Sequence, residues 1–317
     1  MLSRRLLRVK ILQALYAHYK SNSESIAHSE KQLFFSINKA YELYHYLFLL
    51  LVEIVDYANE RIELSRKKKI PTLEDLNPNT RFINNRLIKQ FSVNKHLTNF
   101  LSLNKLNWKN YPELIKNFYL KIIDSEDYIS YLERKEDSYT ADRKIIIQIY
   151  SNLIIQSEEL FQNLEEQSIY WNDDMEFVIN MVIKTIKRFQ DDSDENMPLM
   201  GMYKNEDDKY FVKQLFSKTI LNGEEYRLLI DRHTQNWEID RIAFMDILVM
   251  QLAIAEIIEF PEIPTKVSFN EYIEISKYYS TSKSSNFING ILDKIIHELK
   301  QEKKIVKRGR GLIGENR

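Results

Sequence analysis

The sequence contains no cysteine and very little glycine, and both features exclude several classes of functional site. Without cysteine the chain cannot form disulfides, thiolate nucleophiles or cysteine metal sites, and a reducing compartment suits it. Only six glycines occur in 317 residues, and the first is Gly201. Tight hairpins and phosphate-binding loops need glycine. None of the glycine-rich nucleotide or hydrolase motifs is present, so no catalytic residue and no cofactor are predicted.

Long hydrophobic runs are also missing. The longest, LYHYLFLLLV at 43–52, has ten residues before Glu53 and is too short to span a bilayer. The first residues include arginines and no apolar segment typical of a secretory signal. The six histidines show no metal-ligand spacing, so no metal site is predicted. We therefore expect a soluble cytoplasmic protein that does not contact a membrane.

The charge is distributed unevenly along the chain. The net charge is −1, yet residues 1–20 carry five basic residues and no acidic one. Residues 300–317 carry seven basic residues against two acidic ones, so the rest of the chain is acidic. Such asymmetry indicates a local site for a polyanion rather than a generally basic surface.

Apolar residues recur at helical spacing throughout, as at Leu47, Leu50, Leu51 and Ile54, and predict an all-α fold. Turn-rich segments at 70–80 and 190–208 are the expected boundaries, the second being the best linker candidate. Residues 242–255 are apolar except for Asp246 and Gln251, which predicts the central helix of a bundle. Pro261 and Pro264 end that helix, and Ser268-x-x-Glu271 predicts a capping box for the next one.

Two segments have the residue types that bind nucleic acid. In the first, Arg4, Arg8, Leu12, Leu15 and Tyr19 share one helical face, which is basic for two turns and apolar thereafter. The second is YSTSKSSNFIN at 279–289, where serines, asparagines and a lysine precede or begin a helix. Lysine and arginine neutralise phosphates, while asparagine and serine hydrogen-bond unpaired bases. A glycine follows at 290 and suggests close approach of another backbone or a ligand.

Five stretches in this order resemble the NusB family of transcription antitermination factors. They are RRLLRVKILQALYA at 4–17, KYFVKQLFSKTI at 209–220, WEIDRIAFMDILVMQLAIAEI at 237–257, IPTKVSFNEYIEISKYYS at 263–280 and NFINGILDKI at 286–295. The resemblance implies NusB-like helical bundles, with residues 1–30 and 205–300 forming the core that binds RNA and protein. Residues 31–204 would be a helical insertion of unknown role, and 301–317 a basic flexible tail.

The resemblance also implies a non-catalytic function. Family members bind boxA-type single-stranded RNA of ribosomal RNA transcripts together with NusE, a ribosomal small-subunit protein, within the RNA polymerase antitermination complex. A homodimer through the partner surface remains an alternative when NusE is absent. The implied RNA-binding residues are Arg4, Arg5, Arg8, Lys283, Ser285, Asn286 and Asn289, and those implied to face NusE are Tyr16 and Asp246. On this interpretation the first helix projects from its bundle, and its arginines cover RNA phosphates.

The sequence departs from the family pattern at two positions. The family commonly has arginine where Gln251 stands and a basic residue near Ile247, so the RNA contacts of those side chains are in doubt. The basic tail 303–311 is either a further RNA contact or a disordered end. Two other functions stay open. One is a helical protein–protein adaptor that has lost RNA binding; the other, disfavoured by the missing glycine-rich turn and cysteine, is a part of a ribosomal RNA methyltransferase system.

Overall fold

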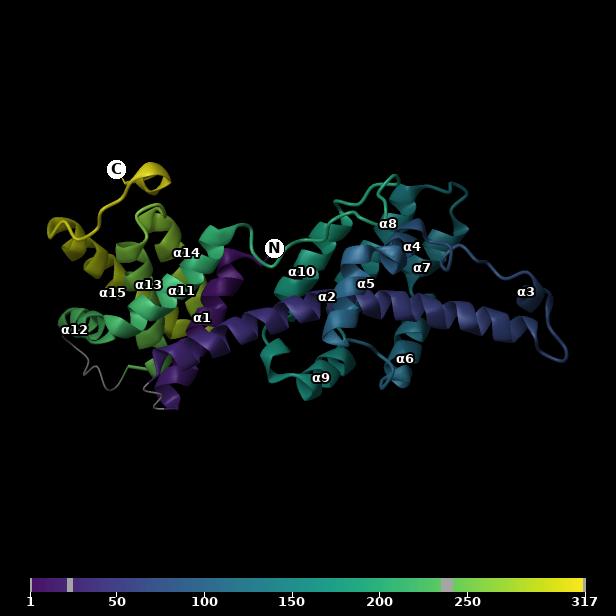
Figure 1. The fold of residues 1–317 in the computed structure, drawn as a ribbon, viewed down its shortest axis with the longest axis horizontal. Helices are drawn as coiled ribbons and strands as arrows, with labels where there is room; N and C mark the ends of the chain where they lie inside the picture. Colours follow the sequence, from purple (N-terminus) through teal and green to yellow (C-terminus); the bar gives the residue numbers. More distant parts are fainter. Residues whose placement is uncertain (1, 22–24, 235–241, 316–317) are drawn as a thin grey trace. The chain divides into compact units, whose positions relative to one another are not determined.

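The computed structural model describes residues 2–21, 25–234 and 242–315 (Figure 1). The structure is 73% helical, and no strand occurs among the described residues, which confirms the all-α prediction. The chain divides into two compact units. Unit 1 comprises Met1–Leu2 and Asn38–Met202, and unit 2 comprises Ser3–Ile37 and Tyr203–Arg317.

Unit 1 is organised around the larger part of the long helix α2 (Ile26–Arg66). The hydrophobic run at 43–52 is the core of this unit, because Leu43, Leu47 and Leu50 are fully buried. Tyr46 stacks on Trp108 with 3.9 Å between ring centroids. The remaining helices of unit 1 are α3 (Leu73–Leu76), α4 (Arg86–Val93), α5 (Lys95–Asn104), α6 (Pro112–Ile123), α7 (Glu126–Glu133), α8 (Tyr139–Gln148), α9 (Glu158–Gln167) and α10 (Met175–Ile186). A π-helical segment (Ile149–Ile154) continues α8.

The predicted linker at 190–208 is largely non-helical but is attached to unit 1. The Asn94 side chain donates a hydrogen bond to the Met197 carbonyl oxygen (2.8 Å), and the Tyr41 hydroxyl donates one to the Met200 carbonyl oxygen (2.9 Å). Most of this segment therefore lies along α2 and α5.

Unit 2 contains α1 (Arg4–Lys20), the start of α2, α11 (Glu206–Leu221), α12 (Gly223–His233), α13 (Phe244–Glu259), α14 (Thr265–Tyr279) and α15 (Ser282–Gln301). Every residue of α13 from Asp246 to Ile257 is buried, and α13 packs against α1, α11, α12, α14 and α15. The predicted central helix of a bundle is confirmed. The few polar side chains of α13 are therefore buried, and only residues of the surrounding helices can form hydrogen bonds with them.

The predicted capping box at the start of α14 is wrong. The helix begins earlier, at Thr265, directly after Pro264. Ser268 and Glu271 therefore lie inside α14, where their side chains bond to α13 and α1 respectively. Proline suits the position before the first helical turn because the N–H it lacks needs no partner there.

Candidate nucleic-acid interface

The three arginines at the start of α1 are all paired with carboxylates. The helix begins after Ser3, whose Oγ accepts a hydrogen bond from the Leu6 N–H (3.2 Å). Arg4 Nε donates to Asp208 Oδ1 at 2.9 Å, from a side chain that is 41% exposed. The ion pair thus connects the first turn of α1 to that of α11.

Arg5 forms a two-point ion pair with α14. Its Nε and Nη2 donate to the two carboxylate oxygens of Glu271 at 2.9 and 2.8 Å. These hydrogen bonds hold the pKa of Glu271 below its usual range and raise that of Arg5. Since the Arg5 side chain is 42% exposed, an incoming phosphate could reach the guanidinium.

Arg8 is buried, and this contradicts its predicted role on a projecting helix. Its side chain is 4% exposed and donates to both oxygens of Glu256, at 2.7 and 2.6 Å. The hydroxyls of Ser268 and Tyr272 also donate to the Glu256 carboxylate, each at 2.7 Å. Burial alone lowers the pKa of Arg8, but Glu256 more than offsets it and the pKa is raised. The arginine faces the core because α13 carries a carboxylate there.

The residues that complete this network, Glu256, Ser268 and Tyr272, were missed from the sequence. The available signal was Glu256 itself, an acidic residue inside an almost entirely apolar helix. A charge in such a helix needs a buried partner of opposite sign. The first helix, which has arginines on its apolar side, offers the buried partner that this carboxylate needs.

The predicted α15 residues are mostly accessible. Thr281 caps the helix by accepting a hydrogen bond from the Ser284 N–H. Asn286 and Asn289 are exposed and Ser285 is half-buried, whereas the side chain of Lys283 lies outside the described residues. No described atom lies within 4 Å of where a Cβ on Gly290 would be. The helix therefore has an open surface at this point, and no part of the described chain explains the glycine.

The α1 and α15 segments lie on neighbouring parts of unit 2. Helix α14 carries Glu271, the partner of Arg5, and packs against α15. The two helices are connected by only two residues and run antiparallel, as shown by a cleft that Thr265 lines together with Lys300. Glu271 and Gly290 are equally far from the turn, so they lie within about one helical turn, ~5 Å, along the axes. Arg5 and the exposed residues around Gly290 thus lie at a similar height along the axes of α14 and α15.

The two residues predicted to face a partner protein lie in different environments. Tyr16 is 39% exposed, and its ring lies 5.8 Å from that of Phe244 at the start of α13. The Lys20 ammonium lies 4.8 Å from the centroid of the same Phe244 ring. Asp246 contradicts the prediction, because it is only 4% exposed and accepts a hydrogen bond from the Ser280 hydroxyl.

The two departures from the family pattern have structural roles. The side-chain amide of Gln251 is buried and donates to the Gly223 carbonyl oxygen at 2.7 Å. Ile247 is 7% exposed and belongs to the core of unit 2. Neither side chain is placed to contact a ligand at the surface.

The predicted flexible tail is packed in the structure. Lys307 Nζ donates to the carbonyl oxygens of Ile257 and Phe260 at 2.8 and 3.1 Å, at the end of α13. A Cβ on Gly311 would lie 1.9 Å from the Pro261 carbonyl oxygen, so only glycine fits there. The ammonium group of Lys307 therefore binds the carbonyl oxygens at the carboxyl end of α13.

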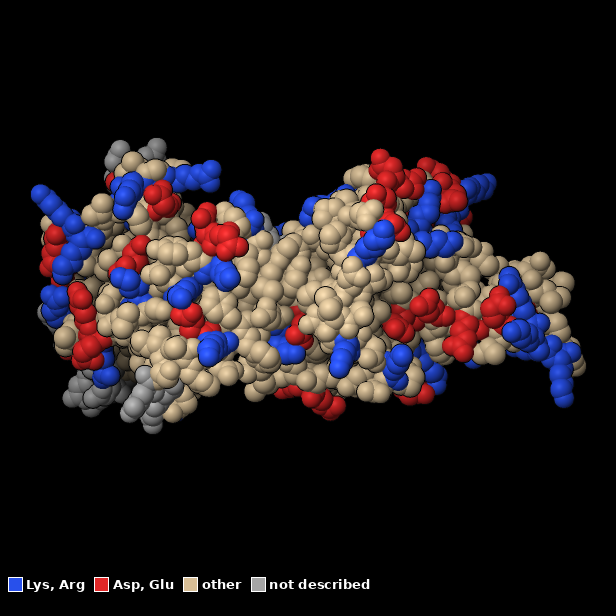
Figure 2. Space-filling view, viewed as in Figure 1, with Lys and Arg blue, Asp and Glu red and all other residues tan. Residues whose placement is uncertain are grey.

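The charges of unit 2 do not form one basic patch on the face drawn in Figure 2, where lysine and arginine alternate with aspartate and glutamate. Within 2–21, 25–234 and 242–315, no cluster of histidine and acidic residues could hold a metal ion. No helix of the described chain is long and apolar enough to cross a membrane.

The fold of unit 2 is an all-α helical domain held together by paired charges. Residues 178–297 match the NusB family, so the chain contains a NusB family domain. Curated relatives named transcription antitermination protein NusB share this region. The protein of Salinibacter ruber is 44% identical over 104 residues, covering 33% of this chain and 65% of the relative.

Two further relatives carry the same name. The protein of Chloroherpeton thalassium is 44% identical over 105 residues, which are 33% of this chain and 50% of the relative. The protein of Natranaerobius thermophilus is 40% identical over 89 residues, which are 28% of this chain and 64% of the relative. This chain spans between half and two thirds of these relatives. No solved structure matches.

Proposed function

We propose that this chain is a non-catalytic, cytoplasmic transcription antitermination factor that binds boxA-type single-stranded RNA of ribosomal RNA transcripts together with NusE. The family domain supports the antitermination role. The main structural support for RNA binding is the accessible guanidinium of Arg5, whose partner Glu271 lies on the helix that packs against α15. Cations would bind the phosphates, and the amides of Asn286 and Asn289 would bind base edges.

In this proposal Arg4 and Arg5 contact RNA directly, and Arg8 does not. Arg8 supports them from beneath by fixing α1 on α13 through Glu256. The partner protein NusE would bind the surface around Tyr16, Lys20 and Phe244, where aromatic rings and an ammonium group are clustered. Aromatic side chains of this kind are enriched in protein interfaces. Asp246 would act there through Ser280 rather than by touching the partner.

The test is a fluorescence-anisotropy titration of boxA-like RNA and a scrambled RNA, with and without NusE, at two salt concentrations. We expect selective binding that NusE tightens and that salt weakens, because phosphate contacts release counterions. Arg5→Gln should weaken binding about fivefold, a typical effect of one accessible charged contact. Lys213→Gln is the matched control, because Lys213 also forms an exposed ion pair in unit 2, with Glu30. Equal and weak binding to both RNAs, unchanged by NusE, would contradict the proposal.

A protein–protein adaptor without RNA binding is the second candidate function. It is favoured by one observation, namely that Arg4, Arg5 and Arg8 already have carboxylate partners within the protein. The same titration separates the two functions. An adaptor would bind NusE and lose that binding on Tyr16→Ala, yet show no salt-sensitive RNA binding.

A further inference from the structure

Unit 1 has a cleft of about 340 Å³ near the end of α2, between α2, α6 and the segment that contains α3. Its volume is in the range of small-molecule sites, and none of its residues was predicted from the sequence to bind a ligand. Tyr57 and Tyr119 form part of the wall, with 5.4 Å between their ring centroids. Both tyrosines are half-buried, so each ring keeps part of its surface accessible.

An arginine without a carboxylate partner lies beside these rings. Arg61 follows Tyr57 by one helical turn on α2 and lines the same cleft. Burial raises the pKa of Tyr119, and the charge of Arg61 partly offsets this effect, so the guanidinium is close enough to act on the Tyr119 hydroxyl. The Arg61 side chain is exposed and forms no ion pair within the described part of the chain.

Four consecutive basic residues, 66–69, end α2 and continue beyond it. Arg66 and Lys68 have carboxylate partners, whereas Lys67 and Lys69 are exposed and form no ion pair with any residue that the structure describes. Figure 2 shows lysine and arginine side chains projecting at this end of unit 1, where Figure 1 places the end of α2 and α3. Together with the arginine in the cleft, two ammonium groups are therefore available to an anion.

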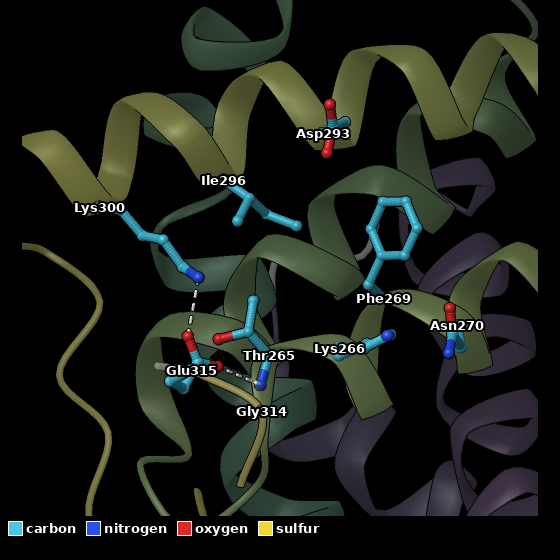
Figure 3. Close-up of a pocket in the computed structure, with 9 residues that line it drawn as sticks. All are labelled: Thr265, Lys266, Phe269, Asn270, Asp293, Ile296, Lys300, Gly314 and Glu315. Carbon is cyan, nitrogen blue, oxygen red and sulfur yellow. Dashed lines mark hydrogen bonds and ion pairs between the residues drawn. The ribbon is translucent and has the colours of Figure 1, made fainter. Parts of the chain in front are cut away.

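The cleft of unit 2 between α14 and α15 differs in this respect (Figure 3). Its Lys300 ammonium pairs with the carboxylate of Glu315, which also accepts a hydrogen bond from the Thr265 N–H. The positive groups of that cleft thus have an anionic partner from the chain itself. At the end of α2, an anion that binds the three available cations displaces no group of the described protein.

Accessible aromatic rings beside unpaired cations are the components of a site for single-stranded RNA. A base can stack on a tyrosine ring while the neighbouring phosphates bind guanidinium and ammonium groups. Glu74 also lines the cleft and can accept a hydrogen bond from an exocyclic amine of a base. A lipid surface fits less of the site. It would contact Ile70 and Leu73, which are 89% and 81% exposed, but it would leave the cleft between the tyrosines empty.

We propose that Arg61, the tyrosine-lined cleft and the basic segment 66–69 form a second site for single-stranded RNA, which binds the part of the transcript that flanks the boxA-type sequence. The choice of RNA as the ligand rests on the proposed function. The site itself lies outside residues 178–297, so the family match does not cover it. Arg61, Lys67 and Lys69 each bind one phosphate, and a base stacks against the tyrosine pair.

The test is a fluorescence-anisotropy titration of the full chain with two RNAs. One is the boxA-like RNA alone, and the other carries the same sequence followed by a polyuridine tail of about 30 nucleotides, which is longer than one such groove binds. We expect the tail to tighten binding about tenfold. It should also steepen the salt slope by about 2, because three phosphate contacts contribute about 0.7 each on a single strand.

Two variants divide this gain into its parts. Lys67→Gln with Lys69→Gln should lower the affinity for the tailed RNA about fivefold and reduce the salt slope by about 1.4, while binding of the short RNA stays unchanged. Tyr119→Leu keeps an apolar side chain in the wall of the cleft. It should weaken binding of the tailed RNA about fivefold without changing the salt slope, because stacking on a ring releases no counterions.

The matched control is Lys184→Gln with Lys187→Gln, which removes the same charge from unit 1. Both lysines are exposed at the end of α10, have no ion pair among the described residues and do not line the cleft. A tail that brings no gain in affinity would overturn the site, as would a gain that the control reduces as much as Lys67→Gln with Lys69→Gln. Selective binding of the short RNA would in either case leave the proposed function standing.

The remaining outcomes separate the site from the proposed function and from a lipid. A short RNA that binds no better than its scrambled form, with a tail effect that still depends on Lys67 and Lys69, would contradict the proposed function and support the site. No binding of either RNA would remove both. Binding to vesicles of phosphatidylcholine and phosphatidylglycerol, lost in Ile70→Ser with Leu73→Ser and without any effect of the RNA tail, would assign this surface to a membrane and overturn the proposal.

Discussion

Replacing Arg8 with methionine should destabilise unit 2 far more than replacing either neighbouring arginine. The substitution leaves the Glu256 carboxylate, which is fully buried, with only the hydroxyls of Ser268 and Tyr272 as partners. Removing one member of a buried ion pair costs about 3–5 kcal/mol, because the remaining charge is not compensated. We therefore expect a loss in this range for unit 2.

Arg4→Met is the matched control on the same helix. The arginine is 41% exposed, so water can reach this ion pair, and the buried Asp208 carboxylate keeps a hydrogen bond from the Lys204 N–H. Removal of Arg4 should therefore cost about 1–2 kcal/mol, less than removal of Arg8. A second variant, Arg8→Met with Glu256→Gln, should recover part of the loss. The amide oxygen can accept from one hydroxyl, the amide NH2 can donate to the other, and no charge is left buried.

The assay must report on unit 2 separately, because a chain with two compact units need not unfold in one step. Hydrogen–deuterium exchange of peptides from α1 and α13, measured across a urea series, gives this resolution. Equal losses for Arg8→Met and Arg4→Met would refute the buried network. So would a double variant that is as unstable as Arg8→Met alone.

Three further predictions concern pH and packing. Burial lowers the pKa of His45 to about 4, against about 6.5 in the unfolded chain. Between these pH values the folded state binds fewer protons than the unfolded state. Unit 1 should therefore lose about 3 kcal/mol of stability as the pH falls from 6.5 to 4. His45→Phe, which keeps the stacking on Phe100, should remove this slope in exchange measurements on α2. Gly311→Ala should detach the tail, because its Cβ would overlap the Pro261 carbonyl oxygen, and faster trypsin cleavage near the tail would report it. Gly290→Ala, where no described atom is close, should instead stabilise α15 by about 0.5–1 kcal/mol, and a destabilised variant would contradict the open surface.

The helices that position the candidate site could be predicted from the sequence where the hydrophobic pattern was unambiguous. Residues 242–255 are apolar on all sides, and such a segment has to be surrounded by other helices. The same holds for the run at 43–52. Its ten residues are too few to span a membrane, so a buried position in a helical core is the remaining explanation. In both cases burial alone determines the outcome.

The environment of the charged residues could not be predicted in the same way. Whether Arg8 projects or is buried depends on the residue opposite it, and Glu256 is separated from it by 248 residues. Local pattern carries no information on such a pairing. Ser268 likewise has capping-box spacing, but its hydroxyl bonds to Glu256, so a tertiary contact overrides the local motif. The glycine at 311 is explained only by the fold of the tail on Pro261.

Because the surface arginines are already paired with carboxylates, the number of basic residues overstates their contribution to RNA binding. A phosphate that binds the Nε–Nη2 edge of Arg5 has to replace the Glu271 carboxylate, which then takes up counterions of its own. The net counterion release is therefore smaller than that of a free cation, for which the salt slope on a single strand is about −0.7 per phosphate. Neutralising the carboxylate removes this competition.

Glu271→Gln should consequently tighten binding of the boxA-like RNA about threefold and make the salt slope steeper by a fraction of that value. The matched control is Glu274→Gln, on the same helix, where the glutamate forms an ion pair with Lys277 and acts on Arg5 only through a weaker coulombic attraction, without a hydrogen bond. If Arg5 only fastens α1 to α14, Glu271→Gln will lower stability and leave RNA affinity and its salt dependence equal to those of Glu274→Gln. If Arg5 changes partners on binding, affinity will rise although an ion pair of the free protein has been lost, and no purely structural role predicts that combination.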